Sequence, residues 1–235
     1  MELLDPKYLI KMFLTHGSLI NEINGSSCGF DVFNFSKDTF VLCDGANSCE
    51  NGGILASLLA NRLVEKWPKF STKSNRINLI HNVILEEHSK FLDKKIEAAS
   101  TIVGLKTITS GFEMISIGDS YGEIFFKDRN SWSKIYSMPR DLDQKGNPWQ
   151  LVGSEVFEKI HYKKFDKTGS YCVFLLSDGA GNFLSQKSFN QITKLIGNNK
   201  PNSYDLDFFS ADLVLQAKKN KSHDDISVAI LYLDF

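Results

Sequence analysis

Two acidic segments of the chain resemble each other and have the residue types of a cation site. Residues 41–47 (VLCDGAN) and 175–182 (LLSDGAGN) each carry an apolar run that leads directly into Asp-Gly. Such a run predicts a buried strand, so Asp44 and Asp178 are expected where two strands emerge, each before a glycine that lets the backbone turn. Two carboxylates at neighbouring strand ends can converge on one point.

Two further apolar segments have acids at their ends. Residues 115–120 (ISIGDS) run into Asp119, and Asp224 with Asp225 opens residues 224–231 (DDISVAIL). Clustered carboxylates raise one another's pKa, so such a site persists mainly when a cation neutralises it. Hard oxygen ligands indicate Mg2+ or Mn2+. A single Asp-Gly is an ordinary turn, but four acidic strand ends in one domain favour a shared metal site.

The composition indicates a soluble globular protein. A length of 235 residues fits one domain over residues 1–235, and 27 basic against 28 acidic residues leave a net charge of -1. This balance provides no field for nucleic acid or an anionic membrane. The acidic N-terminal residues do not suit a signal peptide, and no apolar run approaches the ~18 residues of a membrane span. We therefore expect a cytoplasmic monomer without nucleic-acid or membrane partners.

The cysteine pattern agrees with a reducing compartment. The chain has four cysteines without the paired C-x-x-C spacing of a zinc site: Cys28, Cys43, Cys49 and Cys172. Cys43 and Cys172 lie inside apolar runs that predict strands. All four are therefore interpreted as reduced and structural.

The elements that must position the acids alternate between strands and helices. The pattern predicts strands at residues 30–35, 39–43, 100–108, 112–118, 122–127, 132–137, 171–177 and 226–233. It predicts helices at residues 54–68, 77–98, 187–196 and 205–219, a strand or short helix at residues 8–14 and a loop at residues 17–29. The first two strands form a hairpin that brings Asp31 near Asp44. The four strands between residues 100 and 137 are expected to form an antiparallel meander.

This order of elements predicts an α+β fold with two antiparallel sheets and the helices outside. In the helix at residues 77–98, Glu86 and Glu87 are expected on the face opposite the apolar stripe. Residues 139–158 have no clear period and are long for a connection. They are interpreted as a functional flap or mobile loop, with a plain surface excursion as the alternative.

Taken in order, the acidic motifs resemble those of a known family over nearly the whole chain. The motifs are Asp31, Asp44-Gly45, residues 99–101 (AST), 118–120 (GDS), 177–179 (SDG) and 224–227 (DDIS). They resemble the PP2C-type metal-dependent Ser/Thr protein phosphatases, and their order and spacing are together specific. The resemblance implies a four-layer α-β-β-α sandwich, with two central antiparallel sheets flanked by helix pairs. It also implies hydrolysis of phosphoserine and phosphothreonine in a phosphoprotein substrate.

The resemblance further implies the ligands of two or three Mn2+ or Mg2+ ions. One ion would be held by Asp44, Asp178 and Asp224. A second ion would share Asp44 and contact the carbonyl group of Gly45 and, through water, Asp31.

A third, weaker ion would be held with the help of Asp119. Two cations that share a carboxylate activate water at neutral pH and stabilise the attacking and leaving oxygens of an in-line displacement at phosphorus. Hydrolysis of this kind needs no covalent intermediate, and no cysteine stands in a phosphate loop.

The chain departs from the family pattern at the phosphate-binding position. The family commonly has an Arg five residues before the first Asp and Glu or Gln directly before it, where this chain has Ser26 and Phe30. Arg140, on the proposed flap, is the candidate to contact the substrate in place of the missing Arg. A salt bridge to Asp141 or simple solvation is the more ordinary explanation for Arg140.

A second departure concerns the general acid. Eukaryotic members place a His where this chain has Ala46, and bacterial members do without it, so Ala46 indicates the bacterial branch. His223 precedes Asp224 and could protonate a leaving group, although a His beside a metal carboxylate is more often an electrostatic neighbour.

Two functions stay open on the sequence. The first is an active metal-dependent phosphatase, and the second is a catalytically impaired pseudophosphatase that serves as a binding or regulatory module. The retained acids favour the enzyme, because converging carboxylates oppose folding when no metal is bound.

Overall fold

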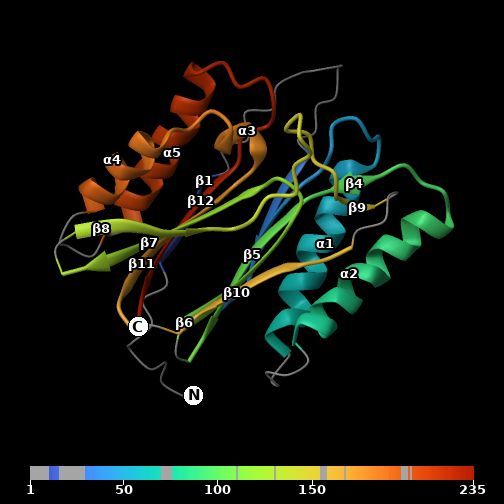
Figure 1. Ribbon diagram of the computed structural model, residues 1–235, viewed down its shortest axis with the longest axis horizontal. Helices are drawn as coiled ribbons and strands as arrows, with labels where there is room; N and C mark the ends of the chain where they lie inside the picture. The colour runs from blue at the N-terminus through green and yellow to red at the C-terminus, as the bar shows by residue number, and fades with distance from the viewer. Residues whose placement is uncertain are drawn as a thin grey trace.

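The computed structural model of the protein describes residues 11–15, 30–69, 76–109, 111–129, 131–153, 158–166, 168–196, 201 and 203–235. The predicted loop at residues 17–29, with Ser26 and Cys28, lies outside the described residues, as do residues 8–10 of the first predicted element. Two sheets pack face to face, and a pair of helices covers the outer face of each (Figure 1). This confirms the predicted α+β class and the four-layer α-β-β-α sandwich.

The first sheet is antiparallel and has five strands. Their order is β10 (His161–Phe165), β6 (Gly111–Ile117), β5 (Ile102–Ile108), β3 (Thr39–Asp44) and β2 (Asp31–Phe35). Helices α1 (Gly52–Lys66) and α2 (Arg76–Asp93) cover it, with a short 3-10 turn, η1 (Trp67–Lys69), after α1. Helix α2 ends before the predicted Ala98. Lys95 adopts a left-handed backbone (φ 53°), and the amide of Ile96 donates to the carbonyl of Phe91, which closes the helix.

The second sheet is also antiparallel and has five strands. Their order is β1 (Lys11–Thr15), β12 (Val228–Asp234), β11 (Ser170–Leu176), β7 (Tyr121–Asp128) and β8 (Ser131–Ser137). Helices α4 (Gln186–Ile196) and α5 (Ser203–Lys219) cover it. The short helix α3 (Asp178–Gly181) follows β11, and β4 (Ala99–Ser100) pairs with β9 (Val152–Gly153). The first predicted element is therefore a strand in its described part.

Alternate residues of the central strands face different cores. In β3, Phe40 and Leu42 face the core between the sheets, whereas Val41 and Cys43 face the core under α1 and α2. Strand β11 shows the same alternation between the two sheets and the α4/α5 core. Because both faces of these strands are covered, their central positions are apolar, and the sequence shows continuous apolar runs that lead into Asp44 and into residues 177–178.

The predicted meander is divided between the two sheets. Strands β5 and β6 belong to the first sheet, and β7 and β8 belong to the second. The chain crosses between the sheets at residues 118–120, so Asp119 lies at the crossing. The prediction that these four strands form one meander was wrong. The hydrophobic pattern does not show whether the next strand pairs with the preceding strand in the same sheet or joins the sheet packed against it. Strands β4, β9 and β10 and helix α3 were not predicted.

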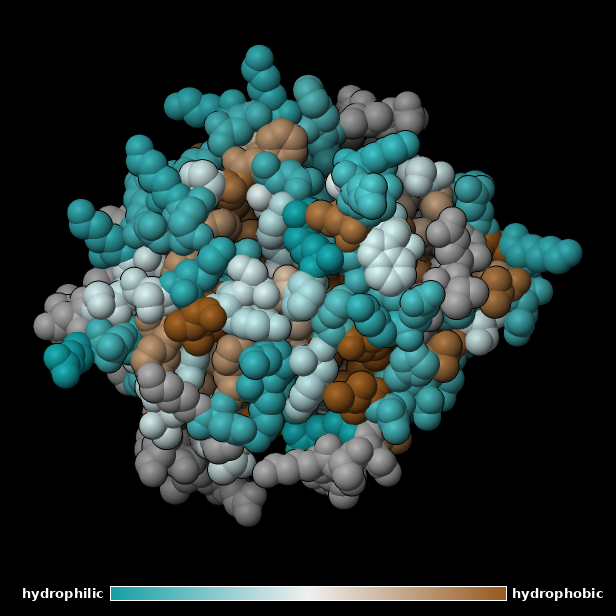
Figure 2. Space-filling view, viewed as in Figure 1, coloured by the Kyte–Doolittle hydropathy of each residue, from teal (hydrophilic) through white to brown (hydrophobic). Residues whose placement is uncertain are grey.

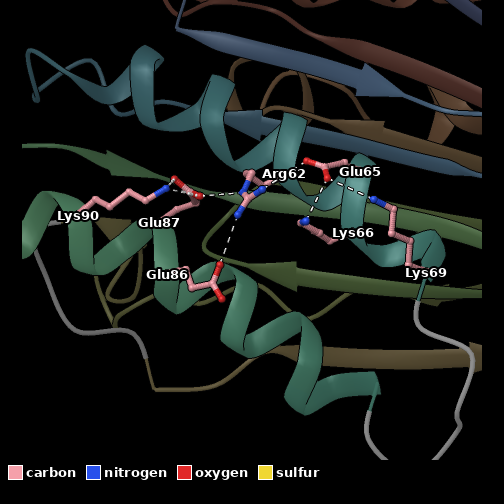
Figure 3. Close-up of polar contacts among 7 residues, drawn as sticks. All are labelled: Arg62, Glu65, Lys66, Lys69, Glu86, Glu87 and Lys90. Carbon is pink, nitrogen blue, oxygen red and sulfur yellow. Dashed lines mark hydrogen bonds and ion pairs between the residues drawn. The ribbon is translucent and has the colours of Figure 1, made fainter.

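Glu87 is buried, which corrects the prediction that it lies on the solvent face of its helix. Its carboxylate is fully shielded and lies 3.0 Å from Nε of Arg62 on α1 and 2.7 Å from Nζ of Lys90 (Figure 3). The adjacent Glu86 is 61% exposed and lies 3.5 Å from Nη2 of the same arginine. Glu87 falls in the groove between α1 and α2, and a buried acid there is stable because it is paired twice.

The face of the molecule seen in Figure 2 is mainly polar. In Figure 2, hydrophilic side chains form most of the outline, and hydrophobic side chains appear in small separate groups. Among the described residues, no helix combines the length and the apolar character needed to span a membrane. Cys43, Cys49 and Cys172 are buried free thiols, as predicted for these three cysteines.

Candidate metal centre

Asp31 and Asp44 lie directly opposite each other in the β2–β3 hairpin. Opposite residues of an antiparallel pair share a face, and Leu42, two residues before Asp44, faces the core between the sheets. Both acids therefore point toward the space between the sheets at the end of β3. The structure thus brings together the two acids that the predicted hairpin was expected to bring together.

The carboxyl group of Asp31 has an unusual environment. Both of its oxygens are shielded from solvent and have no hydrogen-bond partner of normal geometry among the described residues. Burial raises the pKa of Asp31 to about 6, although the nearby hydroxyl groups of Ser177 and Ser227 lower it part of the way. Burial and the charges of Asp31 and Asp178 raise the pKa of Asp44 well above its ordinary value. A nearby positive charge would stabilise the ionised form of such acids.

The glycine of each Asp-Gly segment permits a close approach of two backbones. A Cβ atom at Gly45 would lie 2.5 Å from the main-chain carbon of Gly52, the first residue of α1. A Cβ atom at Gly179 would lie 2.0 Å from the carbonyl oxygen of Asp225. Neither glycine has a positive φ. The expected reason for these glycines, a backbone turn, is therefore corrected to a steric one: only glycine leaves room for the neighbouring chain.

Four of the predicted acids line a single cavity of about 120 Å³ between the ends of the sheets. Asp44 comes from the end of β3, Asp119 from the crossing between the sheets, Asp178 from the start of α3 and Asp224 from the loop before β12. The other lining residues are Ala46, Asn47, Thr101, Pro148 and Leu151. Each sheet thus contributes carboxylates to one enclosed space.

The acids of the cavity raise one another's pKa values. Burial and the charge of Asp178 raise the pKa of Asp119 to about 6, against the lowering effect of Arg140. Burial and the charge of Asp224 raise the pKa of Asp178. A set of like charges in a confined space fits hard divalent cations, which take carboxylate and carbonyl oxygens as ligands.

Two of these carboxylates accept hydrogen bonds from protein amides. Asp224 Oδ1 accepts from the side-chain amide of Asn47 and from the main-chain amide of Asp225, and Asp44 Oδ2 accepts from the amide of Asp178 at 3.4 Å. Among the described residues, no three or more His, Cys, Asp and Glu side chains are arranged as a formed metal site.

The two-sheet architecture is found in known phosphatases. The chain matches the serine/threonine phosphatase PstP/Ppp of Mycobacterium tuberculosis with a TM-score of 0.70 and 13% identity, over 97% of this chain and 98% of that one. It matches the S. agalactiae serine/threonine phosphatase with a TM-score of 0.71 and 18% identity, over 97% of this chain and 100% of that one. No protein-family model matches the sequence, and no curated protein does.

The chain has the fold of these PP2C-type serine/threonine phosphatases. PppA of Pseudomonas aeruginosa, described as a key regulatory component of T6SS, has the same fold, with a TM-score of 0.70 and 14% identity over 97% of this chain and 98% of that one. At these identities, the shared architecture is established, and activity must be argued from the residues of this chain.

Within this phosphatase fold, Arg140 does not form the expected salt bridge with Asp141. Its Nε donates to the main-chain oxygen of Asp119 at 2.7 Å, whereas Asp141 accepts from Nε2 of His161 at 2.7 Å and from the amide of Gly118 at 2.8 Å. The salt bridge was one of two ordinary explanations for Arg140, the other being solvation. Arg140 is half-buried and contacts Asp119, which lines the cavity, although Arg140 itself is not among the lining residues, and Asp141 is buried.

The remaining predicted residues have distinct positions. His223 is exposed and is not among the residues that line the cavity. The Gly45 amide donates to the carbonyl of Phe30 at 3.1 Å. Asp225 is buried, and its Oδ2 accepts from the amide of Phe30 at 2.7 Å, so it ties the start of β2 to the loop before β12.

Several residues of the site were missed by sequence reasoning. Thr101 accepts from the amide of Asp44 at 3.2 Å and lies 2.6 Å from the hydroxyl oxygen of Ser120. Both belong to motifs that resemble the phosphatase pattern, which was the signal available for them. Asn47, which follows the first Asp-Gly segment, had no signal, because its contact with Asp224 spans most of the chain.

Proposed function

We propose that this protein is a metal-dependent phosphatase that hydrolyses phosphoserine and phosphothreonine in proteins by direct attack of water, without a covalent intermediate. The observation that carries the proposal is the convergence of Asp44, Asp119, Asp178 and Asp224 on one cavity from both sheets. The raised pKa values of Asp119 and Asp178 support it, because a bound cation would offset the cost of ionising these acids together.

The residues that would hold the cations follow the placement of the acids. Asp44, Asp178 and Asp224 would hold one ion, and Asp44, the Gly45 carbonyl group and Asp31 would serve a second. Asp119 would help to hold a third. Mn2+ and Mg2+ suit these oxygen donors. When bound, such ions lower the pKa of water and stabilise charge on phosphoryl oxygens.

A solved neighbour supports the choice of metal. The catalytic domain of PstP, in complex with two manganese ions, matches the chain with a TM-score of 0.69 and 13% identity, over 97% of this chain and 98% of that one. Manganese is therefore the first ion to test.

The thiol groups of the chain support attack by water in place of a cysteine nucleophile. Cys43 and Cys172 are fully buried, and burial raises the pKa of both thiols far above the ordinary value. A nucleophilic cysteine needs an accessible, low-pKa thiolate. The cavity is lined by carboxylates and by no cysteine.

A second candidate function is a binding or regulatory module that has the phosphatase fold but is catalytically impaired. The observation that favours it is that the described acids do not form a finished metal site, with Asp224 bonded to Asn47 instead. In either case we propose a phosphoprotein partner and a monomer in the cytoplasm.

Hydrolysis of a phosphothreonine peptide tests the proposal. The wild type, Asp44→Asn and Asp178→Asn would be assayed with Mn2+, with Mg2+ and with a chelator, and Asp128→Asn would be the control, because Asp128 is exposed at the far end of β7. We expect turnover that requires metal, is lost in both site variants and is retained in the control. Binding of Mn2+ by folded wild type without turnover of any phosphopeptide would support the second candidate.

A further inference from the structure

The guanidinium group of Arg140 is held in one position by three neighbours. Its Nε donates to the main-chain oxygen of Asp119 at 2.7 Å, and its Nη2 donates to Oδ1 of Asn182 at 3.2 Å. Its central carbon lies 3.8 Å from the centroid of the Tyr121 ring. A planar guanidinium stacked on an aromatic face and bonded at one edge has lost most of its freedom before any ligand arrives.

The neighbours of Arg140 are themselves fixed to one another. The hydroxyl group of Tyr121 donates to Oδ1 of Asn182 at 2.7 Å. The side-chain nitrogen Nδ2 of Asn182 lies 3.5 Å from Oδ2 of Asp178. The ring of Tyr121 lies against Gly181, where a Cβ atom would be 2.0 Å from Cδ2 of the ring. Gly181 thus leaves the space that the ring occupies.

The backbone on both sides of Arg140 is also fixed. The amide of Met138 donates to the carbonyl of Gly122, and the amide of Asp141 donates to the carbonyl of Gly118, both at 2.8 Å. The carboxylate of Asp141 in turn accepts from the amide of Gly118 at 2.8 Å. The residue that carries the guanidinium is therefore bound to the same crossing segment that carries Asp119.

The guanidinium lies at the edge of the acidic cavity. It contacts Asp119 directly and Asp178 through Asn182, and both acids line the cavity. Its charge lowers the pKa of both carboxyl groups, as expected for a nearby cation. Nη1 makes no hydrogen bond to any described residue, so one edge of the group remains for a ligand.

The charge balance of the cavity calls for such a group. With the five acids assigned to the ions above, two divalent cations would leave a net charge of -1 and three would leave +1. The two negative charges of a phosphomonoester would make the site negative in either case, so a further positive partner would stabilise the bound phosphate. A guanidinium binds phosphate oxygens through two parallel hydrogen bonds and keeps its charge at every working pH.

We propose that Arg140 binds the phosphoryl group of the substrate, and that Tyr121 and Asn182 are positioning residues that hold its guanidinium at the cavity edge. This inference rests on the proposed function, since it assigns the phosphoryl subsite of that same cavity. A competing role for Arg140 is to neutralise the acids and thereby act on metal binding alone.

The two roles predict different effects of removing Arg140 on phosphate binding and on Mn2+ affinity. If Arg140 binds phosphate, its removal weakens phosphate binding and leaves Mn2+ affinity unchanged or tighter, because one positive charge near the ions is gone. If Arg140 serves only the acids, its removal changes Mn2+ affinity and leaves phosphate binding by the metal-loaded protein unchanged.

The experiment measures binding of inorganic phosphate to the Mn2+-loaded protein by calorimetry, with Mn2+ affinity and phosphothreonine-peptide kinetics alongside. Arg140→Gln is expected to weaken phosphate binding by roughly 10- to 100-fold and to raise KM more than it lowers kcat. Arg140→Lys keeps the positive charge and serves as a second variant in case Arg140→Gln does not fold. It should bind phosphate more tightly than Arg140→Gln but more weakly than the wild type. Arg129→Gln, at the exposed far end of β7, is the control.

A double-mutant cycle tests the positioning role. Tyr121→Phe keeps the ring and removes the hydroxyl group, and Asn182→Ala removes the shared acceptor. Each is expected to weaken phosphate binding by about 2- to 10-fold in the wild type and to have no further effect on Arg140→Gln, because groups that act through Arg140 are coupled to it. Full additivity would overturn the positioning role.

The outcomes for the subsite and for the proposed function can be separated. Phosphate binding that depends on Arg140 in a protein that hydrolyses no phosphopeptide would support the subsite and contradict the hydrolase. Metal-dependent hydrolysis and phosphate binding that are both unchanged in Arg140→Gln would overturn the subsite and leave the proposed function intact. Absence of phosphate binding by the Mn2+-loaded wild type would also overturn the subsite.

Discussion

Asp31 and Asp44 are paired across two strands with their carboxyl groups on the same face, and burial raises the pKa of each. Like charges directly opposite each other destabilise a hairpin unless something else compensates. The cation proposed above would provide this compensation for Asp31 and Asp44.

Removal of the Asp31 charge should stabilise the metal-free protein. We expect Asp31→Asn to raise the free energy of unfolding by roughly 1–3 kcal/mol at pH 7.5, since a buried acid with a raised pKa is costly to ionise. A Tm increase of about 2–4 °C per kcal/mol should follow in the presence of a chelator. The same variant should bind Mn2+ more weakly. Equal Tm values for the two proteins without metal would contradict this expectation.

The metal-free protein should also lose stability as the pH rises. The pKa of Asp31 and that of Asp119 are each raised to about 6, so the folded state retains protons that the unfolded state releases above pH 4. The stability that these two groups contribute is fully present below about pH 4 and is lost as the pH rises through 6. Thermal unfolding from pH 4.5 to 7.5 with a chelator, compared with Asp31→Asn, isolates the contribution of Asp31.

Saturating Mn2+ should remove this pH dependence, because the cation replaces the protons. The control is the same pH series with Mn2+ present. A difference between the wild type and Asp31→Asn that stays constant over the pH range would disprove the assignment.

An alanine at Gly179 should disrupt the cavity. Its Cβ would lie 2.0 Å from the carbonyl oxygen of Asp225, so the loop that carries Asp224 must move away. We expect a loss of about 2–4 kcal/mol in stability and at least a tenfold weaker Mn2+ affinity. Gly146→Asn is the matched control, because Gly146 has open space around it and asparagine tolerates its positive φ. Normal Mn2+ affinity in folded Gly179→Ala would contradict the steric argument.

Glu86 and Glu87, two of the three glutamates that contact Arg62, should differ in their contribution to stability. Glu87→Ala removes a buried partner of two cations and should cost about 1–3 kcal/mol, whereas Glu86→Ala removes an exposed partner and should change stability by less than about 0.5 kcal/mol. Urea unfolding of both variants is the measurement. Similar losses for the two would show that burial does not distinguish them.

Much of the fold and part of the candidate site could be predicted from the sequence. A strand covered on both faces is mainly apolar, so residues 41–43 and 175–176 marked the central strands, and the acids after them marked where those strands end. The hairpin of β2 and β3 followed from its short polar turn, which placed Asp31 near Asp44. These features depend on neighbours in the sequence.

Only the tertiary structure decided which acids share a cavity, that Glu87 is buried, that Arg140 contacts Asp119 and Asn182 in place of Asp141, and that Asn47 bonds to Asp224. Each of these contacts joins segments far apart in the chain, and local pattern does not encode the packing of one element against another. The sequence by itself determined the chemistry of the strand ends, because continuous apolar runs, which burial on both faces favours, lead into Asp44 and Asp178. The packing of the two sheets then determined which of those groups meet.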